Sequence, residues 1–536
     1  MKKQGSVFRI NQEGFVPGLP IHAVLLTDGE VRLKDPEGKT VYTVPQGELR
    51  EDAASGDRVR LAEIPPLAEG KYTLESGEEQ REFAVRARGW REVSNALIKG
   101  LYFQRCGCAL ESAHAGVYHH PRCHTAPAVG WDDRTLVRRV PGGWHDAGDY
   151  GKYTGPGAVT AAHMIYAWKL FPQGCSDELN IPESGNGLPD ILNEVKYELD
   201  WLLEMQRSDG AFYHKLTKAQ FAPFIMPQDD LETEYLMPVS HCATAAACAC
   251  MALAARVWQG YSPAFANRAV LAAKRAWDWL QAHPDFVPYR NPEGVRTGWY
   301  GDMSDRDERF WAACELYAAT GEENYRAEAE KLYGEGLNLT AFGWADVSGM
   351  GALCCLFELK EKGGEVLYGR VKEDFLQRSE QILQWTKASG YGTALPADRY
   401  GWGSILPIMS GAMAMIINWL LTGNEKMRDG ALQQWHYALG MNALDLCFIT
   451  GYGTHRVMHP HHRPSGSDGI EDPVPGLIAG GPNGNHNYPQ TKEKLEGLPP
   501  AKCYLDELPS ADTNEIAIYW NSPAIFTGAF VNQIST

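Results

Sequence analysis

Clusters of basic residues and long apolar runs are both scarce in this chain of 536 residues. Its formal charge is -17, whereas nucleic-acid-binding surfaces gather Lys and Arg, so we expect no nucleic-acid partner. No stretch approaches a membrane span, and no apolar run of signal-peptide type follows Met1. We therefore expect no membrane association, and a cytoplasmic monomer, or a secreted one if a leader has been removed.

Cysteines at the spacing of a disulfide framework are also lacking, although the chain has 12 of them. Half lie in apolar, helix-like runs and are typical of small buried thiols; they are Cys242, Cys248, Cys250, Cys314, Cys354 and Cys355. Aromatic residues, in contrast, are plentiful, with 16 Trp, 24 Tyr and 17 Phe. Flat aromatic faces suit the apolar faces of sugar rings, although most rings in a large protein pack in the core.

The chain divides into a strand-like part and a helical part. Short alternating runs separated by turns at 28–29, 36–38 and 55–57 predict a small all-β sandwich. They lie at 7–10, 23–26, 31–33, 58–61, 71–74 and 82–85. We place the domain boundary at residue 88, which gives domains 1–88 and 89–536. The segment up to Val85 contains no Trp, so we expect a structural role for the sandwich.

Helical periodicity dominates after about residue 89. It predicts helices at 94–103, 158–170, 191–205, 243–258, 264–281, 309–319, 325–333, 374–388 and 409–421. Gly321 and Gly423 each follow a helical run and precede acidic residues, a pattern that ends one helix and begins the next. Repeated hairpins predict an α-solenoid or a closed α/α barrel. Loops rich in His, Asp and Gly favour the barrel.

Two carboxylates separated by Ala147-Gly148 form the first candidate site. Asp146 and Asp149 lie where one turn can direct both toward a common point, one orienting a water and the other taking its proton. A helix N-terminal turn with a capping Asp explains this tetrapeptide equally well.

A third carboxylate, Glu515, lies among Ile, Ala, Tyr and Trp residues. Apolar surroundings raise a carboxyl pKa and keep it protonated, as a general acid requires. Taken alone, the segment around Glu515 is also consistent with an amphipathic helix on which this Glu is exposed. His461 and Arg463, in a Pro-bounded loop, can donate hydrogen bonds to neutral hydroxyls, bind a metal or form a structural network.

Two groups of residues have the chemistry of metal ligands. Thiolates and imidazoles suit tetrahedral zinc, and the candidates are Cys106, Cys123, His124 and His145, with Cys108, His119 and His120 nearby. Buried thiols beside unrelated histidines remain the alternative. Four filled positions make such an ion structural, and it would hold the loop that continues into Asp146. Carboxylates at 302–308, with Asp346, suit calcium or simply complement a helix N-terminus.

These segments together resemble glycoside hydrolase family nine, the cellulases with an N-terminal immunoglobulin-like domain. The resemblance covers nearly the whole chain and rests on residues 10–17, 143–149, 450–463, 474–483 and 514–523, in the expected order. It implies an immunoglobulin-like sandwich followed by a large all-α (α/α)6 barrel. It also implies an endoglucanase that cleaves β-1,4-glucans with inversion, with no catalytic cofactor.

By position, the resemblance makes Asp149 the general base, Asp146 its partner on the water, and Glu515 the general acid. His461 and Arg463 match the pair that contacts sugar hydroxyls, and Trp402 a stacking residue. The implied zinc ligands are Cys106, Cys123, His124 and His145, with Cys108 less favoured. The implied calcium ligands are Ser304, Asp307, Glu308 and Asp346, and this loop does not align cleanly at Asp302.

Two residues depart from the family pattern. Trp520 stands where many members have Tyr, so we expect it to bind substrate in a differently shaped cleft. Ala511 replaces an aromatic, which leaves the role of Asp506 open. The alternative activity is an exo-acting hydrolase of short β-linked oligosaccharides, either a cellodextrinase or an exo-β-glucosaminidase. From other classes we weigh a carbohydrate-binding protein without activity and a zinc hydrolase; in the latter, four protein ligands leave no position for water.

Overall fold

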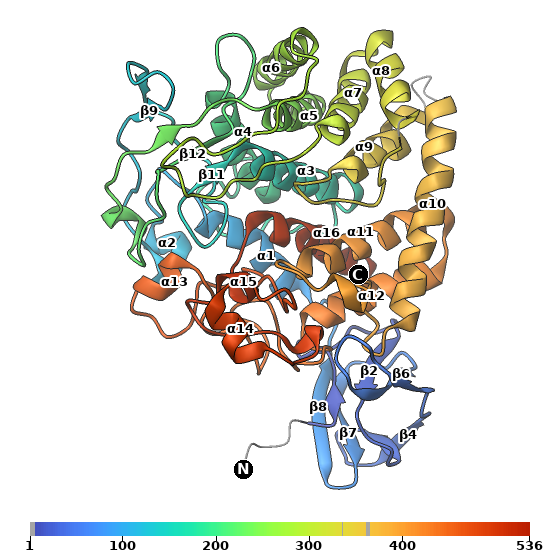
Figure 1. Ribbon diagram of the computed structural model, residues 1–536. Helices are drawn as coiled ribbons and strands as arrows, with labels where there is room; N and C mark the ends of the chain where they lie inside the picture. Colours follow the sequence, from blue (N-terminus) through green and yellow to red (C-terminus); the bar gives the residue numbers. More distant parts are fainter. Residues whose placement is uncertain (1–5, 335, 361–364, 536) are drawn as a thin grey trace.

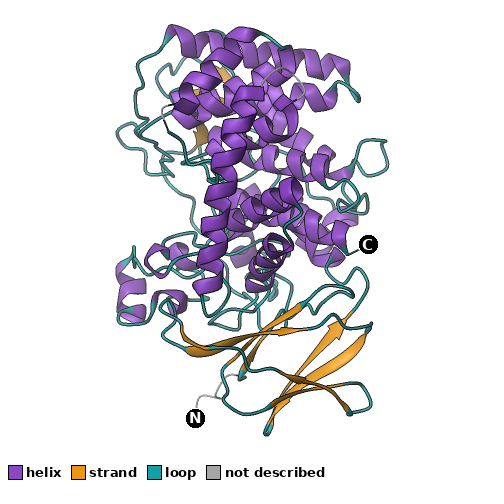
Figure 2. Ribbon diagram, turned by 90° about the vertical axis from the view of Figure 1, so that its right-hand side faces the viewer, coloured by secondary structure: helices purple, strands orange, loops and turns teal. Residues whose placement is uncertain are grey.

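A small β-domain is attached to one end of a large helical domain (Figure 1, Figure 2). The computed structural model describes residues 6–334, 336–360 and 365–535. The last strand of the β-domain ends at Val85, and the first helix begins at Arg91.

The β-domain consists of two four-stranded antiparallel sheets, with strand orders β1-β2-β6-β5 and β4-β3-β7-β8. Its strands are β1 Phe8–Arg9, β2 Ile21–Leu25, β3 Val31–Lys34, β4 Thr40–Val44, β5 Leu49–Glu51, β6 Arg58–Ile64, β7 Gly70–Ser76 and β8 Glu79–Val85. All six predicted runs correspond to strands. The sequence analysis missed β4 and β5, which bury too few side chains to produce a clear alternation.

Each of the nine predicted helical stretches coincides with a helix. The longer helices are α1 Arg91–Phe103, α3 Thr154–Leu170, α4 Asp190–Glu204, α5 His241–Trp258, α6 Pro263–Ala282, α7 Arg306–Thr320, α8 Glu323–Gly334, α9 Ser348–Cys354, α10 Glu365–Ala388, α11 Ile405–Thr422, α12 Glu425–Ala438 and α16 Ile518–Ile534. The short ones are α2 Ser112–Ala115, α13 Arg463–Ser467, α14 Pro489–Leu495 and α15 Ala511–Asn514. The predicted hairpin glycines are confirmed, because Gly321 and Gly423 end α7 and α11 with φ of 72° and 71°.

Helices α3, α5, α7 and α9 pack against one another in sequence order, and α16 packs against α1, α3 and α11. Helix α5 is rich in alanine, which lets α3, α6 and α7 approach it closely. Ser240 caps its start by accepting a hydrogen bond from the Ala243 N–H.

Two helices have the length and composition of a membrane span, contrary to the expectation that no stretch approaches one. They are α5 and α11, and 89% and 67% of their residues are buried within the protein. Core helices of soluble proteins have the same character, so this composition alone is weak evidence for a membrane.

A five-stranded sheet within the helical domain was not predicted. Its order is β10-β9-β13-β12-β11, with strands β9 Ala128–Gly130, β10 Val137–Arg138, β11 Lys152–Tyr153, β12 Lys215–Thr217 and β13 Tyr235–Leu236. These strands have two or three residues each, too few for a period of two to be recognised. The segment 139–151, which contains both aspartates, connects β10 to β11.

The β-domain contacts loops of the helical domain. The Asp52 carboxylate accepts a hydrogen bond from the Gly390 N–H at 2.9 Å, and the Asp57 carboxylate accepts one from the Tyr391 hydroxyl at 2.8 Å. Lys502 pairs with Asp57 at 2.6 Å. These contacts hold the segments that lead to Trp402 and to Glu515, which fits the structural role expected for the sandwich.

Candidate active site

Asp146 and Asp149 lie in a loop that the surrounding backbone fixes closely. The Gln104 carbonyl accepts a hydrogen bond from the His145 N–H at 2.7 Å, and the Gln104 side chain donates to the carbonyls of His145 and Ala147 at 3.0 Å. A Cβ placed on Gly148 would lie 1.8 Å from the His461 carbonyl oxygen. The glycine between the aspartates is therefore required by the close approach of a second loop.

Glu515 lies between α15 and α16, beside the aspartate loop. Ala147 pairs with Ala517, and His461 pairs with Glu515, in isolated β-bridges. The Ile518 N–H donates to the Asp146 carbonyl at 2.8 Å. The three segments singled out in the sequence are thus joined by their backbones, although the aspartate loop lies more than 300 residues before the other two along the chain.

The three carboxylates have different surroundings. The Tyr300 hydroxyl donates to Oδ2 of Asp146, whose Oδ1 is buried without a partner among the described residues. Burial raises the pKa of Asp146 well above its ordinary value, Tyr300 lowers it and the nearby charge of Asp149 raises it. Asp149 is 7% exposed, and its Oδ2 accepts a hydrogen bond from the Gly151 N–H at 3.0 Å.

Burial also raises the pKa of Glu515 well above its ordinary value. The charges of Asp149 and Asp146 raise it further, while Arg463 and the Gly148 N–H lower it. Burial thus favours the protonated form of Glu515, which suits this carboxyl for donating a proton, as a general acid does.

His461 and Arg463 are held in place by carbonyl oxygens. The Nδ1–H of His461 donates to the Leu508 carbonyl at 2.7 Å. Arg463 donates from Nε to Ala222 at 2.8 Å and from Nη1 to Gly148 at 2.9 Å. Arg463 therefore braces the aspartate loop itself, which agrees with the structural network that the sequence left as one alternative.

Asp506, whose role the sequence left open, is a structural residue. Its carboxylate accepts hydrogen bonds from the N–H groups of Met458 and His459, both at 2.8 Å, and from the Asn514 side chain at 3.1 Å. Asp506 thus ties the loop before His461 to the residue before Glu515.

Asp149, Glu515, His461 and Arg463 line one cavity of about 570 Å³. Trp402 lines it with 41% of its surface exposed, which suits a stacking residue. Trp520 is only 3% exposed and packs against Gly403 and Gly480, so it serves mainly as a wall. Further aromatic residues that the sequence analysis missed line the same cavity: Tyr153, Phe221, Trp299, Tyr300, Trp344, Tyr488 and Tyr519.

The four predicted zinc ligands come together. One ligand atom from each of Cys106, Cys123, His124 and His145 lies within 4.8 Å of the others. The Nδ1 of His124 is 3.3 Å from the Nε2 of His145, and the Nε2 of His124 is 3.2 Å from an Asp230 carboxylate oxygen. A histidine that faces a metal with one nitrogen and a carboxylate with the other is typical of zinc sites, so these residues fit the ion.

The predicted calcium ligands overlap only in part with the group of potential ligand atoms that lie close together. Cys242, Asp302 and Glu308 each place a ligand atom within 4.8 Å of the others. Glu308 and Asp302 each have a buried carboxylate oxygen without a partner among the described residues. Asp307 accepts a hydrogen bond from the Val347 N–H at 2.8 Å, and Asp346 accepts from Ser348. The Ser304 carbonyl accepts from the Cys242 thiol. Buried oxygen atoms in excess of donors fit a hard cation.

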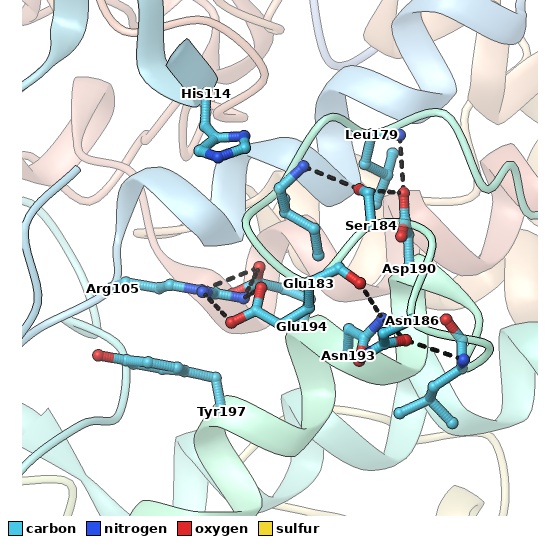
Figure 3. Close-up of polar contacts among 12 residues, drawn as sticks. Arg105, His114, Leu179, Glu183, Ser184, Asn186, Asp190, Asn193, Glu194 and Tyr197 are labelled. Atoms are coloured by element: carbon cyan, nitrogen blue, oxygen red, sulfur yellow. Dashed lines mark hydrogen bonds and ion pairs between the residues drawn. The ribbon is translucent and has the colours of Figure 1, made fainter. Parts of the chain in front are cut away.

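An ion-pair cluster that was not predicted joins Arg105 to Glu183 and Glu194 (Figure 3). Arg105 forms bidentate pairs with Glu194 at 3.0 and 3.1 Å and with Glu183 at 2.9 and 3.0 Å. Glu194 also accepts a hydrogen bond from the Trp144 indole at 2.8 Å, and Trp144 directly precedes His145. The cluster thus supports both the metal ligands and the aspartates.

Replacing Arg105 by alanine should lower the free energy of unfolding by about 3–5 kcal/mol, because Glu194 would keep a fully buried, unpaired charge. Urea denaturation measures the change. Arg91→Ala is the matched control, since its pair with the exposed Glu178 should contribute under about 1 kcal/mol. Equal losses of unfolding free energy in the two variants would show that the cluster stabilises the fold no more than an exposed ion pair does.

A helical domain whose loops bring paired carboxylates, hydroxyl-binding side chains and aromatic faces to one cavity defines a glycoside hydrolase. The chain belongs to glycosyl hydrolase family 9, whose model matches residues 90–528, and the model of the cellulase N-terminal Ig-like domain matches residues 3–81. The predicted family is confirmed.

Relatives match over nearly the full length. A cellodextrinase from Butyrivibrio fibrisolvens is 35% identical, over 96% of this chain and 98% of its own. The crystal structure of a single mutant of a thermostable endoglucanase from Alicyclobacillus acidocaldarius has 32% identity and a TM-score of 0.93, covering 98% of this chain and 99% of that one. A zinc-binding triple mutant of the endoglucanase J30 has 32% identity and a TM-score of 0.91, covering 96% and 99%.

Proposed function

We propose that this protein is an endo-β-1,4-glucanase that cleaves cellulose-type glucans and cello-oligosaccharides with inversion, on an (α/α)6 barrel. The observation that carries the proposal is the placement of Asp149 and Glu515 in one aromatic cavity, with the pKa of Glu515 raised by burial. The successive packing of α3, α5, α7 and α9, and of α16 on α3 and α11, supports the barrel.

In this mechanism Glu515 donates its proton to the glycosidic oxygen, and Asp149 takes a proton from the attacking water. Asp146, held by Tyr300, orients that water through its free Oδ1. Inversion requires the acid and base carboxyls to be roughly 6.5–9.5 Å apart, against about 5–5.5 Å for retention. His461 and Arg463 donate to sugar hydroxyls near the cleaved bond, while Trp402 stacks on a ring.

We further propose structural metals and no catalytic one. Cys106, Cys123, His124 and His145 would hold Zn²⁺, which binds their loops together and fixes His145 next to Asp146. Ser304, Asp307, Glu308 and Asp346 would hold Ca²⁺, with Asp302 as a further candidate because its carboxylate lies beside Glu308. We also propose a monomer without membrane or nucleic-acid partners, and the charge of -17 supports the last point.

The second candidate is an exo-acting hydrolase of short β-linked oligosaccharides, because a relative 35% identical over nearly its whole length is a cellodextrinase. Product profiles on carboxymethyl-cellulose, cellopentaose and chitosan oligomers separate the two. An endo-acting enzyme lowers the viscosity of carboxymethyl-cellulose early and releases mixed oligomers. Release of one short product, with the viscosity unchanged, would favour the exo-acting alternative, and cleavage of chitosan oligomers alone would indicate a glucosaminidase.

The raised pKa of Glu515 predicts a defined pH dependence. Catalysis needs this carboxyl protonated, so kcat/KM should fall as the pH rises through the pKa of Glu515 in the substrate-free folded protein. The free energy of unfolding should also fall as the pH rises. The reason is that the folded state binds this proton more tightly than the unfolded state, where the pKa is about 4.3. The parent should therefore lose stability relative to Glu515→Gln as the pH rises above that value.

Melting temperatures of the parent and Glu515→Gln across the pH range test this. The difference should grow toward alkaline pH and vanish in acid. Glu507→Gln, at an exposed site, is the control and should show no such trend. A constant difference for Glu515→Gln would contradict the raised pKa.

A further inference from the structure

A second cavity, of about 580 Å³, adjoins the catalytic cavity and has no part in the mechanism above. It lies between the loop before α9, the C-terminal half of α10 and the first turns of α11. Helix α10 contacts both α9 and α11. None of the carboxylates assigned to catalysis lines this second cavity.

Trp344 lines both cavities and forms the wall between them. Its ring meets the Tyr300 ring edge to face, with centroids 4.9 Å apart and planes at 88°. Tyr300 in turn donates to Asp146. Trp344 and Tyr300 thus connect the lining of the second cavity to the aspartate loop.

The walls of the second cavity combine aromatic faces with hydrogen-bond donors. Trp385 is half-buried, and the exposed Arg399 holds its guanidinium 4.9 Å from the centre of the Trp385 ring. Arg378 also lines the cavity, but its guanidinium is already paired with the Asp374 carboxylate at 2.7 Å. The guanidinium of Arg399 lies over the Trp385 ring, so the two side chains together offer flat surface and N–H donors, which match the apolar faces and the hydroxyls of a pyranose ring.

We propose that this second cavity binds the part of a neutral glycan substrate that extends beyond the catalytic cavity, in contact with Trp385 and hydrogen-bonded by Arg399. The proposal rests on the proposed glucanase function and adds a determinant of substrate length. The bound part is either the continuing main chain or a sugar branch, since the same chemistry recognises both.

The test measures kcat/KM for cellotriose through cellohexaose and for a xyloglucan oligosaccharide, with the parent, Arg399→Ala and Trp385→Ala. The variants should retain the parental value on the shortest substrate. The gain in kcat/KM with length should shrink by about tenfold, because a lost ring contact costs about 1.4 kcal/mol. If the effect falls on cello-oligosaccharides, the cavity binds main chain; if it falls on the xyloglucan oligosaccharide alone, it binds a branch.

Two matched controls separate binding from stability. Arg370→Ala removes a guanidinium on α10, the helix that also carries Trp385, and this guanidinium stacks on Tyr333. Trp168→Ala removes a half-buried indole in contact with Tyr261. Neither residue lines a cavity with the catalytic or second-cavity residues, so both controls should keep the parental dependence on length. Arg399 is exposed, so its loss leaves the fold intact even if Trp385→Ala is unstable.

Parental length dependence in both variants, with an active parent, would overturn the proposal. An equal loss on every substrate, including the shortest, would also overturn it, because the cavity would then serve the catalytic step itself. If the parent cleaves no glucan at all, the proposed function fails instead, and the two failures are distinguished by the parental measurement.

Discussion

Replacing Asp149 by alanine should lower kcat on cello-oligosaccharides by about 10²–10⁴-fold, the usual contribution of a general acid or base. Glu515→Ala should cause a loss of similar size. Both variants should fold, since the aspartate loop is held mainly by backbone groups and Gln104. Asp146→Ala should lose less, because Asp146 orients the water rather than accepting its proton. Asp285→Ala, at an exposed site, is the matched control.

The leaving group separates the roles of the two residues. A dinitrophenyl cellobioside needs little protonation of its leaving oxygen, so Glu515→Ala should be much less impaired on it than on cellotetraose. Asp149→Ala should be impaired on both, because water must still be activated. The reverse pattern would exchange acid and base, and a largest loss in Asp146→Ala would show that the two aspartates are assigned in the wrong order.

Removing zinc should have the largest effect on stability. We expect about one ion per chain by elemental analysis, and chelation should lower the free energy of unfolding by several kcal/mol, because ligand binding and folding are coupled. Activity should fall as well, since His145 is next to Asp146. Thermal denaturation with and without a chelator, followed by zinc restoration, measures both effects.

Single substitutions identify the zinc ligands. Cys123→Ser should abolish stoichiometric zinc, and Asp230→Asn should weaken zinc affinity by about 10–100-fold through His124. Cys108→Ser is the matched control: Cys108 lies outside the group of four and should leave zinc and stability unchanged. A metal-free protein with the parental stability and activity would rule the site out.

Much of the helical domain was predictable, because amphipathic periodicity and the glycines at 321 and 423 are local signals. Helix α16 was missed, since it is buried on every side, so that it has no polar face, and it contains Pro523. The sheet β9–β13 was missed because its strands are too short to show a pattern. Tertiary contacts rather than local sequence determine both elements.

The candidate acid and base could be proposed from the sequence because each lies in a distinctive segment, whereas their neighbours in the fold could not. Nothing adjacent to Tyr300 in sequence indicates that its hydroxyl reaches Asp146, since the contact spans 154 residues. The same holds for Arg105 and its partner Glu194, which are 89 residues apart. The sequence indicates candidate reacting groups, and only the fold reveals the groups that hold them.

The anomeric configuration of the first product tests the central claim most directly. Proton NMR of cellotetraose hydrolysis should show the α-anomer forming first, before mutarotation, because water attacks the face opposite the leaving group while Asp149 takes its proton. Initial formation of the β-anomer would mean retention, and would contradict the assignment of Asp149 and Glu515 as an inverting base and acid.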